Sequence, residues 1–95
     1  MTYEELKRRI KDEGLDQYGT YAFDRMGGVY VATCIWKNSN GTVSYCFTDE
    51  RGSAFAEHLN IPEGEACDQL YSLAHDAKGI AEYRTNRSRP DQPAG

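Results

Sequence analysis

Residues 29–48, VYVATCIWKNSNGTVSYCFT, decide the fold class of this chain. β-Branched and aromatic residues dominate the stretch, as they do in strands. The polar run that ends in Asn40-Gly41 interrupts it with residues that favour a tight turn. The pattern therefore predicts two antiparallel strands, 29–37 and 42–48, joined as a hairpin.

A third strand, 20–25, precedes this hairpin, and Gly27-Gly28 predicts a two-residue turn that makes the three strands an antiparallel meander. We expect an even number of loop residues in both turns, which decides the side chains that share a face. The first face collects Tyr21, Phe23, Tyr30, Ala32, Cys34, Trp36, Val43, Tyr45 and Phe47. The second face collects Ala22, Asp24, Val29, Val31, Thr33, Ile35, Ser44, Cys46 and Thr48. Cys34 and Cys46 then lie on opposite faces, which excludes a disulfide between them.

Helices are expected before and after the strands along the chain. Thr2 and Glu5 fit a capping box that begins a helix over 2–13. Ser53 can cap a short helix over 53–59, and a longer helix over 62–78 begins at a proline.

Gly79 leaves two alternatives open, because a glycine inside a helix costs about 1 kcal/mol relative to alanine. The long helix either continues through it or ends there, and residues 80–85 then form a fourth, edge strand. The expected fold is a single α+β domain over 1–85, with two C-terminal helices packed on the sheet. Residues 86–95 have the composition of a flexible tail.

Composition narrows the function classes. The chain has 95 residues and a net charge of −4, which disfavours a generally basic nucleic-acid binder. No apolar run approaches the roughly 18 residues of a membrane span. Three widely spaced cysteines, an odd number, indicate reduced thiols and a cytoplasmic protein. No catalytic or metal-binding motif is recognisable, so we expect neither an enzyme nor a cofactor or metal.

The acidic residues gather in one part of the chain. Residues 1–48 hold six acidic and six basic residues, whereas residues 49–82 hold eight acidic and two basic ones. An acidic surface attracts a basic partner and raises the rate of association. The candidate partner-binding residues are Glu57, Glu63, Glu65, Asp68, Tyr71, Asp76 and Glu82.

In size, in charge and in its expected mixed α+β fold, the chain is similar to the anti-CRISPR proteins, by which phages disable host defences. This is a resemblance of class and rests on no diagnostic motif, so it assigns no individual residue. It implies a non-enzymatic inhibitor whose acidic helical face covers a basic surface of a CRISPR effector subunit in the host cytoplasm, with no direct contact to nucleic acid.

A nucleic-acid-binding or regulatory domain is the alternative. It would use the aromatic sheet face or the basic first helix. A homodimer also remains open, because an exposed aliphatic sheet face (Val29, Val31, Ile35) would favour one.

Overall fold

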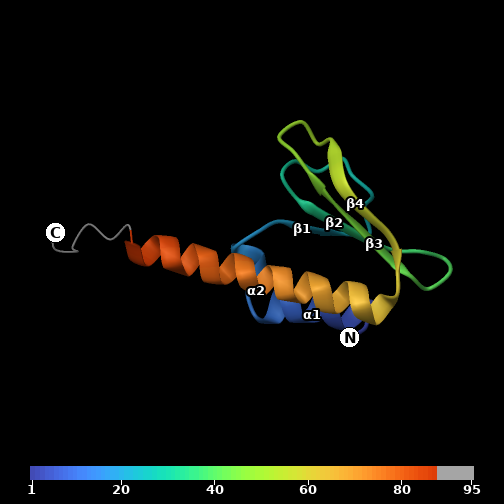
Figure 1. The fold of residues 1–95 in the computed structure, drawn as a ribbon, viewed down its shortest axis with the longest axis horizontal. Helices are drawn as coiled ribbons and strands as arrows, with labels where there is room; N and C mark the ends of the chain where they lie inside the picture. Colours follow the sequence, from blue (N-terminus) through green and yellow to red (C-terminus); the bar gives the residue numbers. More distant parts are fainter. Residues whose placement is uncertain (88–95) are drawn as a thin grey trace.

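The structure is a computed structural model and describes residues 1–87. Two helices lie along one face of a four-stranded sheet, and the longer helix runs out beyond the sheet (Figure 1). The sheet order is β1-β2-β3-β4. The elements in chain order are α1 (Tyr3–Asp12), a 3-10 turn (Leu15–Gln17), β1 (Tyr21–Phe23), β2 (Thr33–Lys37), β3 (Val43–Thr48), β4 (Ala54–Ile61) and α2 (Glu63–Arg87).

α1 begins as the capping box predicts. The Thr2 hydroxyl accepts a hydrogen bond from the N–H of Glu5 at 3.1 Å. After the helix, Gly14 takes a left-handed conformation (φ 67°) that leads the chain into the 3-10 turn. The buried side of α1 consists of Tyr3, Leu6 and Ile10. The helix expected over 2–13 is confirmed, with ends shifted by one residue.

β1 and β2 are neighbours, but they run parallel, with Phe23 opposite Ile35. The antiparallel turn expected at Gly27-Gly28 is therefore wrong. Parallel neighbours need a connection that returns along the strand, and residues 24–32 supply it. The apolar residues from Val29 onward thus belong to this connection, and Val31 has a φ of 46°, outside the strand region.

Tyr3 fastens α1 to this parallel pair. Its hydroxyl oxygen lies 2.8 Å from Asp24 Oδ1 and 3.0 Å from the carbonyl oxygen of Ile35. The N–H of Asp24 donates to the same hydroxyl at 3.0 Å and to the Ile35 carbonyl at 2.7 Å. Burial, and then the hydrogen bond to Asp24, raise the pKa of Tyr3.

The loop between β2 and β3 corrects the expected faces of the sheet. Lys37 lies opposite Val43, so the loop has five residues, 38–42, instead of an even number. Gly41, with a φ of 87°, provides the left-handed position typical of odd hairpin loops. A shift of one residue moves every side chain of a strand to the other face.

Two consequences follow from this register. Ile35 enters the core, whereas Trp36 lies on the face away from Tyr45 and is half-buried. Cys34 and Cys46, expected on opposite faces, are buried directly opposite each other. The geometric argument against a disulfide between them is therefore wrong.

A strand replaces the short helix expected over 53–59. β4 pairs antiparallel with β3, and Phe55 and His58 lie opposite Phe47 and Tyr45. Two left-handed residues, Ala56 (φ 49°) and Asn60 (φ 56°), interrupt β4. Such irregularities destroy the alternation by which a strand is recognised in a sequence. The second C-terminal helix is therefore absent from residues 1–87.

α2 continues through Gly79 and has 25 residues, so the alternative edge strand over 80–85 is wrong. The tail expected from residue 86 falls partly on this helix, and its remainder, 88–95, lies outside the described residues. Whether residues 1–85 form one independent domain stays a prediction. Within residues 1–87, no helix is both long and apolar enough to cross a membrane.

The core lies between the helices and the inner face of the sheet, which we define as the face turned toward α1 and α2. It is built from α1, the 3-10 turn, β2, β3 and the first half of α2. Its buried members are Tyr3, Leu6, Ile10, Leu15, Ile35, Val43, Tyr45, Ala66, Cys67, Leu70 and Ala74. The core thus holds the first half of α2 in place and leaves the second half outside it.

Candidate protein-binding surface

The outward side of α2 carries exposed carboxylates. At 100° per residue, Glu65 and Asp76 lie on the side of the helix opposite to the buried Leu70 and Ala74. Asp68 is exposed beside them, about 60° around the helix from Glu65. Glu82 is also exposed, but it lies about 100° around the helix from Glu65 and about 120° from Asp76. We define the acidic face as Glu65, Asp68 and Asp76, over which the helix rises about 17 Å.

Only part of this charge is balanced by neighbouring groups. Asp68 accepts a hydrogen bond from the Met1 amine at 3.0 Å, and this bond raises the pKa of the amine. Glu82 lies 3.9 Å from Lys78. Lys78 and Arg84, the basic residues of α2 with described side chains, both follow Asp76 in the helix, so neither stands among Glu65, Asp68 and Asp76. The acidic face therefore remains an anionic strip.

Glu63, a predicted site residue, has a structural role. One of its carboxylate oxygens accepts the N–H of Tyr3 at 2.9 Å and lies 3.3 Å from the ammonium group of Lys37. The hydrogen bond from Tyr3, followed by Lys37, lowers the pKa of Glu63. Glu63 thus joins the beginnings of both helices to β2 and does not belong to the acidic face.

Tyr71 also connects elements within the fold. Its hydroxyl donates to the Glu13 carboxylate at 2.7 Å, and His75 Nε2 lies 3.1 Å from the same carboxylate. The guanidinium of Arg9 lies 5.6 Å from the centre of the Tyr71 ring. Hydrogen bonding by Tyr71, and then by His75, lowers the pKa of Glu13. This cluster ties the end of α1 to the middle of α2.

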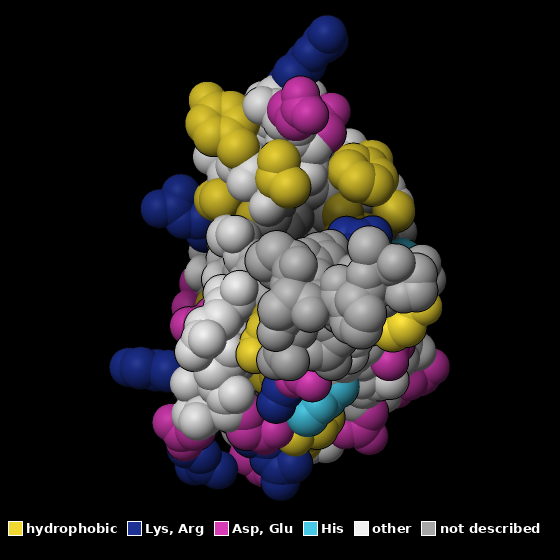
Figure 2. Space-filling model, turned by 90° about the vertical axis from the view of Figure 1, so that its left-hand side faces the viewer, with side chains coloured by type: hydrophobic (Ala, Val, Ile, Leu, Met, Phe, Trp, Pro, Cys, Tyr) yellow, Lys and Arg dark blue, Asp and Glu magenta, His cyan; other side chains and the backbone are white. Residues whose placement is uncertain are grey.

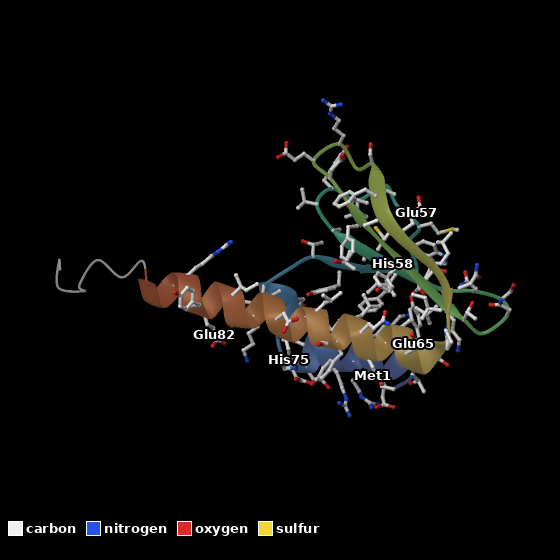
Figure 3. The ribbon with its side chains drawn as sticks, in the orientation of Figure 1. Met1, Glu57, His58, Glu65, His75 and Glu82 are labelled. Carbon is white, nitrogen blue, oxygen red and sulfur yellow. The ribbon has the colours of Figure 1, made fainter. Side chains whose placement is uncertain are left out.

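Glu57 lies apart from the other predicted residues (Figure 3). It belongs to β4, and its charge helps to raise the pKa of the Cys46 thiol, behind burial and the charge of Cys34. Cys46 is on the sheet face away from the helices, so Glu57 is on that side too. The structure brings three of the seven predicted residues together, Glu65, Asp68 and Asp76, and separates Glu57, Glu63, Tyr71 and Glu82 from them.

The thiols are poorly suited to nucleophilic catalysis. All three cysteines are buried. Burial raises the pKa of Cys67 to about 11 and also raises that of Cys46. A thiol is reactive as its thiolate, which an elevated pKa suppresses at neutral pH. Within residues 1–87, no three His, Cys, Asp or Glu side chains are grouped closely enough to hold a metal ion.

The sequence analysis placed Tyr45 and Phe47 on one aromatic face, but it missed that β4 extends this row on the inner face with Phe55 and His58. The His58 ring stacks on Tyr45 with ring centres 4.7 Å apart, and Phe55 lies 6.2 Å from Phe47. Phe55 is 52% exposed. The sequence AFAEHLNI does contain the two ring side chains, Phe55 and His58. Because residues 53–59 were assigned to a helix, the pairing of this segment with β3 was not recognised.

Comparison of this chain with protein-family models, with curated proteins and with solved structures finds no match.

Proposed function

We propose that this chain is a non-enzymatic protein-binding inhibitor. The acidic face of α2 binds a basic protein surface that ordinarily holds nucleic acid. The observation that carries the proposal is the run of three exposed carboxylates, Glu65, Asp68 and Asp76, over about 17 Å of one helix side, with no lysine or arginine between them in the sequence.

Two features support this choice. The strip stands on a regular helix whose first half is fixed by the core, so its charges are held in place before binding. Preorganisation of this kind lowers the cost of association. The spacing of the carboxylates along a rod lets the strip follow a groove built for a phosphate backbone, where Lys and Arg side chains are the usual contacts.

The resemblance to anti-CRISPR proteins gives the proposal its partner. The basic surface is then a DNA- or guide-RNA-binding channel of a CRISPR effector subunit, and the inhibitor occupies it in place of the nucleic acid. Charge complementarity makes such binding fast and sensitive to salt.

One form of the alternative, a nucleic-acid-binding domain that uses the basic first helix instead of the aromatic sheet face, is less well supported. Lys7 lies 2.8 Å from Asp24 and 3.7 Å from Glu4. Arg9 lies 3.5 Å from Glu5. Carboxylates therefore already neutralise part of the positive charge that a phosphate backbone would need.

The test is an affinity capture from bacterial lysate after nuclease treatment, at low and raised salt. The variant Glu65→Lys/Asp76→Lys reverses two charges of the acidic face without touching the Asp68 pair with the Met1 amine. The control Glu50→Lys/Glu57→Lys makes the same change of charge on the β3–β4 turn and β4. We expect wild type and control to retain the same protein, the variant to lose it by at least tenfold, and raised salt to weaken it.

Retention of that protein by the Glu65→Lys/Asp76→Lys variant would refute the assignment of the surface. Recovery of nucleic acid that nuclease treatment removes would refute the proposed function itself and favour the alternative.

A further inference from the structure

The second half of α2 carries an apolar stripe that residues 1–87 leave exposed. Among the described α2 side chains, Ala74 is the last that is buried. Leu73 is 44% exposed and Ile80 is 53% exposed. Leu73, Ala77, Ile80 and Arg84 follow one another at intervals of four, three and four residues, which is the spacing of a helix-packing seam. We call these four residues the α2 seam.

The inner face of the sheet is open at its far end. A hollow of about 460 Å³ there is lined by Val31, Thr33, Phe47 and Phe55, among others. A second hollow of about 400 Å³ shares Val31 and Phe55 and reaches Asp49, Glu50 and Arg51 at the β3–β4 turn. Val31 is 61% exposed. Seen from the end of α2, hydrophobic side chains gather over the sheet and charged ones around the helices (Figure 2).

We propose that these two surfaces bind each other between two copies of the chain. The α2 seam of each copy lies against the open sheet of the other, with Ile80 beside Phe55. Each copy offers one helix surface and one sheet surface, so a two-fold arrangement uses both surfaces twice and closes as a dimer.

Charge complementarity favours a second copy as the occupant. Arg84 follows Ile80 by four residues, about 6 Å further along the helix. The hollow that receives Ile80 continues to Asp49, Glu50 and Arg51, which together carry one net negative charge. With the C-terminal end of α2 directed toward the β3–β4 turn, an Ile80 placed beside Phe55 brings Arg84 to this net negative turn of the partner copy.

The exposed apolar area is also of the right size. At roughly 160–200 Å² for each complete side chain, the exposed parts of Val31, Phe55, Leu73 and Ile80 amount to roughly 380 Å² per copy. A standard interface buries about 800 Å² per partner, of which roughly 500 Å² is apolar. These four side chains thus supply most of the apolar area that a stable dimer needs.

The first experiment measures the mass of the purified full-length protein by light scattering during gel filtration, from about 1 to 100 µM. We expect twice the chain mass of 10.7 kDa at the higher concentrations. Ile80→Glu, at an exposed position, should raise the dissociation constant at least 30-fold while the far-UV circular dichroism is unchanged. The control Gly79→Glu adds the same charge one residue away, where a new Cβ atom meets nothing within 4 Å, and should remain dimeric.

A second experiment tests how the surfaces meet. Phe55→Glu should also be monomeric, because it disrupts the sheet surface. Mixing it with Ile80→Glu should restore a dimer, since one of the two helix-on-sheet contacts in the mixed pair is then intact. Failure of the mixture to dimerise, with a dimeric wild type, would overturn this arrangement.

A wild type that stays monomeric at 100 µM would overturn the proposal and favour an apolar segment of a foreign protein as the occupant. The outcome is independent of the proposed function. An apolar dimer interface should persist in 0.5 M salt, whereas capture of a basic partner by the acidic face should weaken.

Discussion

Replacing Tyr3 by phenylalanine tests the parallel pairing of β1 and β2. Only with this pairing does one hydroxyl group reach both Asp24, which follows β1, and Ile35 in β2. In an antiparallel hairpin turning at Gly27-Gly28, Ile35 would lie far from Asp24. The substitution removes the hydroxyl and keeps the ring that packs in the core, so it isolates the hydrogen bonds.

The expected loss of unfolding free energy is about 1–2 kcal/mol, the contribution of one hydrogen bond to a partly exposed carboxylate. The loss is no larger because the groups left behind keep other partners. The N–H of Asp24 still donates to the Ile35 carbonyl at 2.7 Å. The Asp24 carboxylate still lies 2.8 Å from Lys7. At roughly 5 °C per kcal/mol for a domain of this size, the melting temperature should fall by about 5–10 °C.

The assay is urea unfolding followed by circular dichroism, with Tyr21→Phe as the control. Tyr21 is half-buried on the inner face of the sheet, and its hydroxyl has no hydrogen bond among the described residues. Removal of this hydroxyl should therefore change the free energy of unfolding by less than about 0.5 kcal/mol. Equal stability of Tyr3→Phe and wild type would refute the reasoning. A loss above about 4 kcal/mol would also do so, because it would mean that the backbone groups had become unpaired.

Three further predictions concern other parts of the fold. Both thiols are buried, so oxidised glutathione should link Cys34 to Cys46 only as local opening exposes them, and a peptide map should show Cys67 free. Directly opposite residues with Cα atoms about 5.5 Å apart match disulfide geometry. The pKa of Glu63 is lowered in the folded state. Its contribution to stability should therefore be complete above about pH 4.5 and should disappear as the pH falls through the pKa of the folded state. Glu63→Gln should flatten the dependence of the unfolding free energy on pH in that range. Gly41→Ala should destabilise the protein by about 1–2 kcal/mol because φ is 87°, whereas Gly79→Ala should stabilise it by about 0.5–1 kcal/mol in urea titrations.

Elements that depend on interactions between residues close in sequence were predicted correctly, whereas features that depend on distant contacts were not. α1 depends on local capping and a regular apolar stripe, and both were visible around Thr2 and Leu6. The strands of the β2–β3 hairpin were found for the same reason. Their faces were wrong because a single loop residue decides them, and Asn38–Thr42 is compatible with an odd or an even loop.

β4 could not be recognised locally. Its two left-handed residues break the alternation of side chains, and its exposed surface lacks the apolar signal of a buried strand. The candidate surface was predicted in part for a similar reason. Helical periodicity placed Glu65 and Asp76 outward, but nothing near Glu63 indicates that its carboxylate binds a backbone N–H sixty residues away.

The pairing of the first helix with the last has a consequence for folding during synthesis. Contacts of the Met1 amine, Tyr3 and Glu13 with α2 join residues 67, 60 and 58 positions apart. While the ribosome is still adding α2, α1 has only its contacts with the 3-10 turn and with the β1–β2 pair, and the aromatic row of β3 lies open to solvent. Exposed apolar surface of this kind invites aggregation. We therefore expect the chain to reach its final fold only after α2 leaves the ribosomal tunnel, and to depend on chaperones until then.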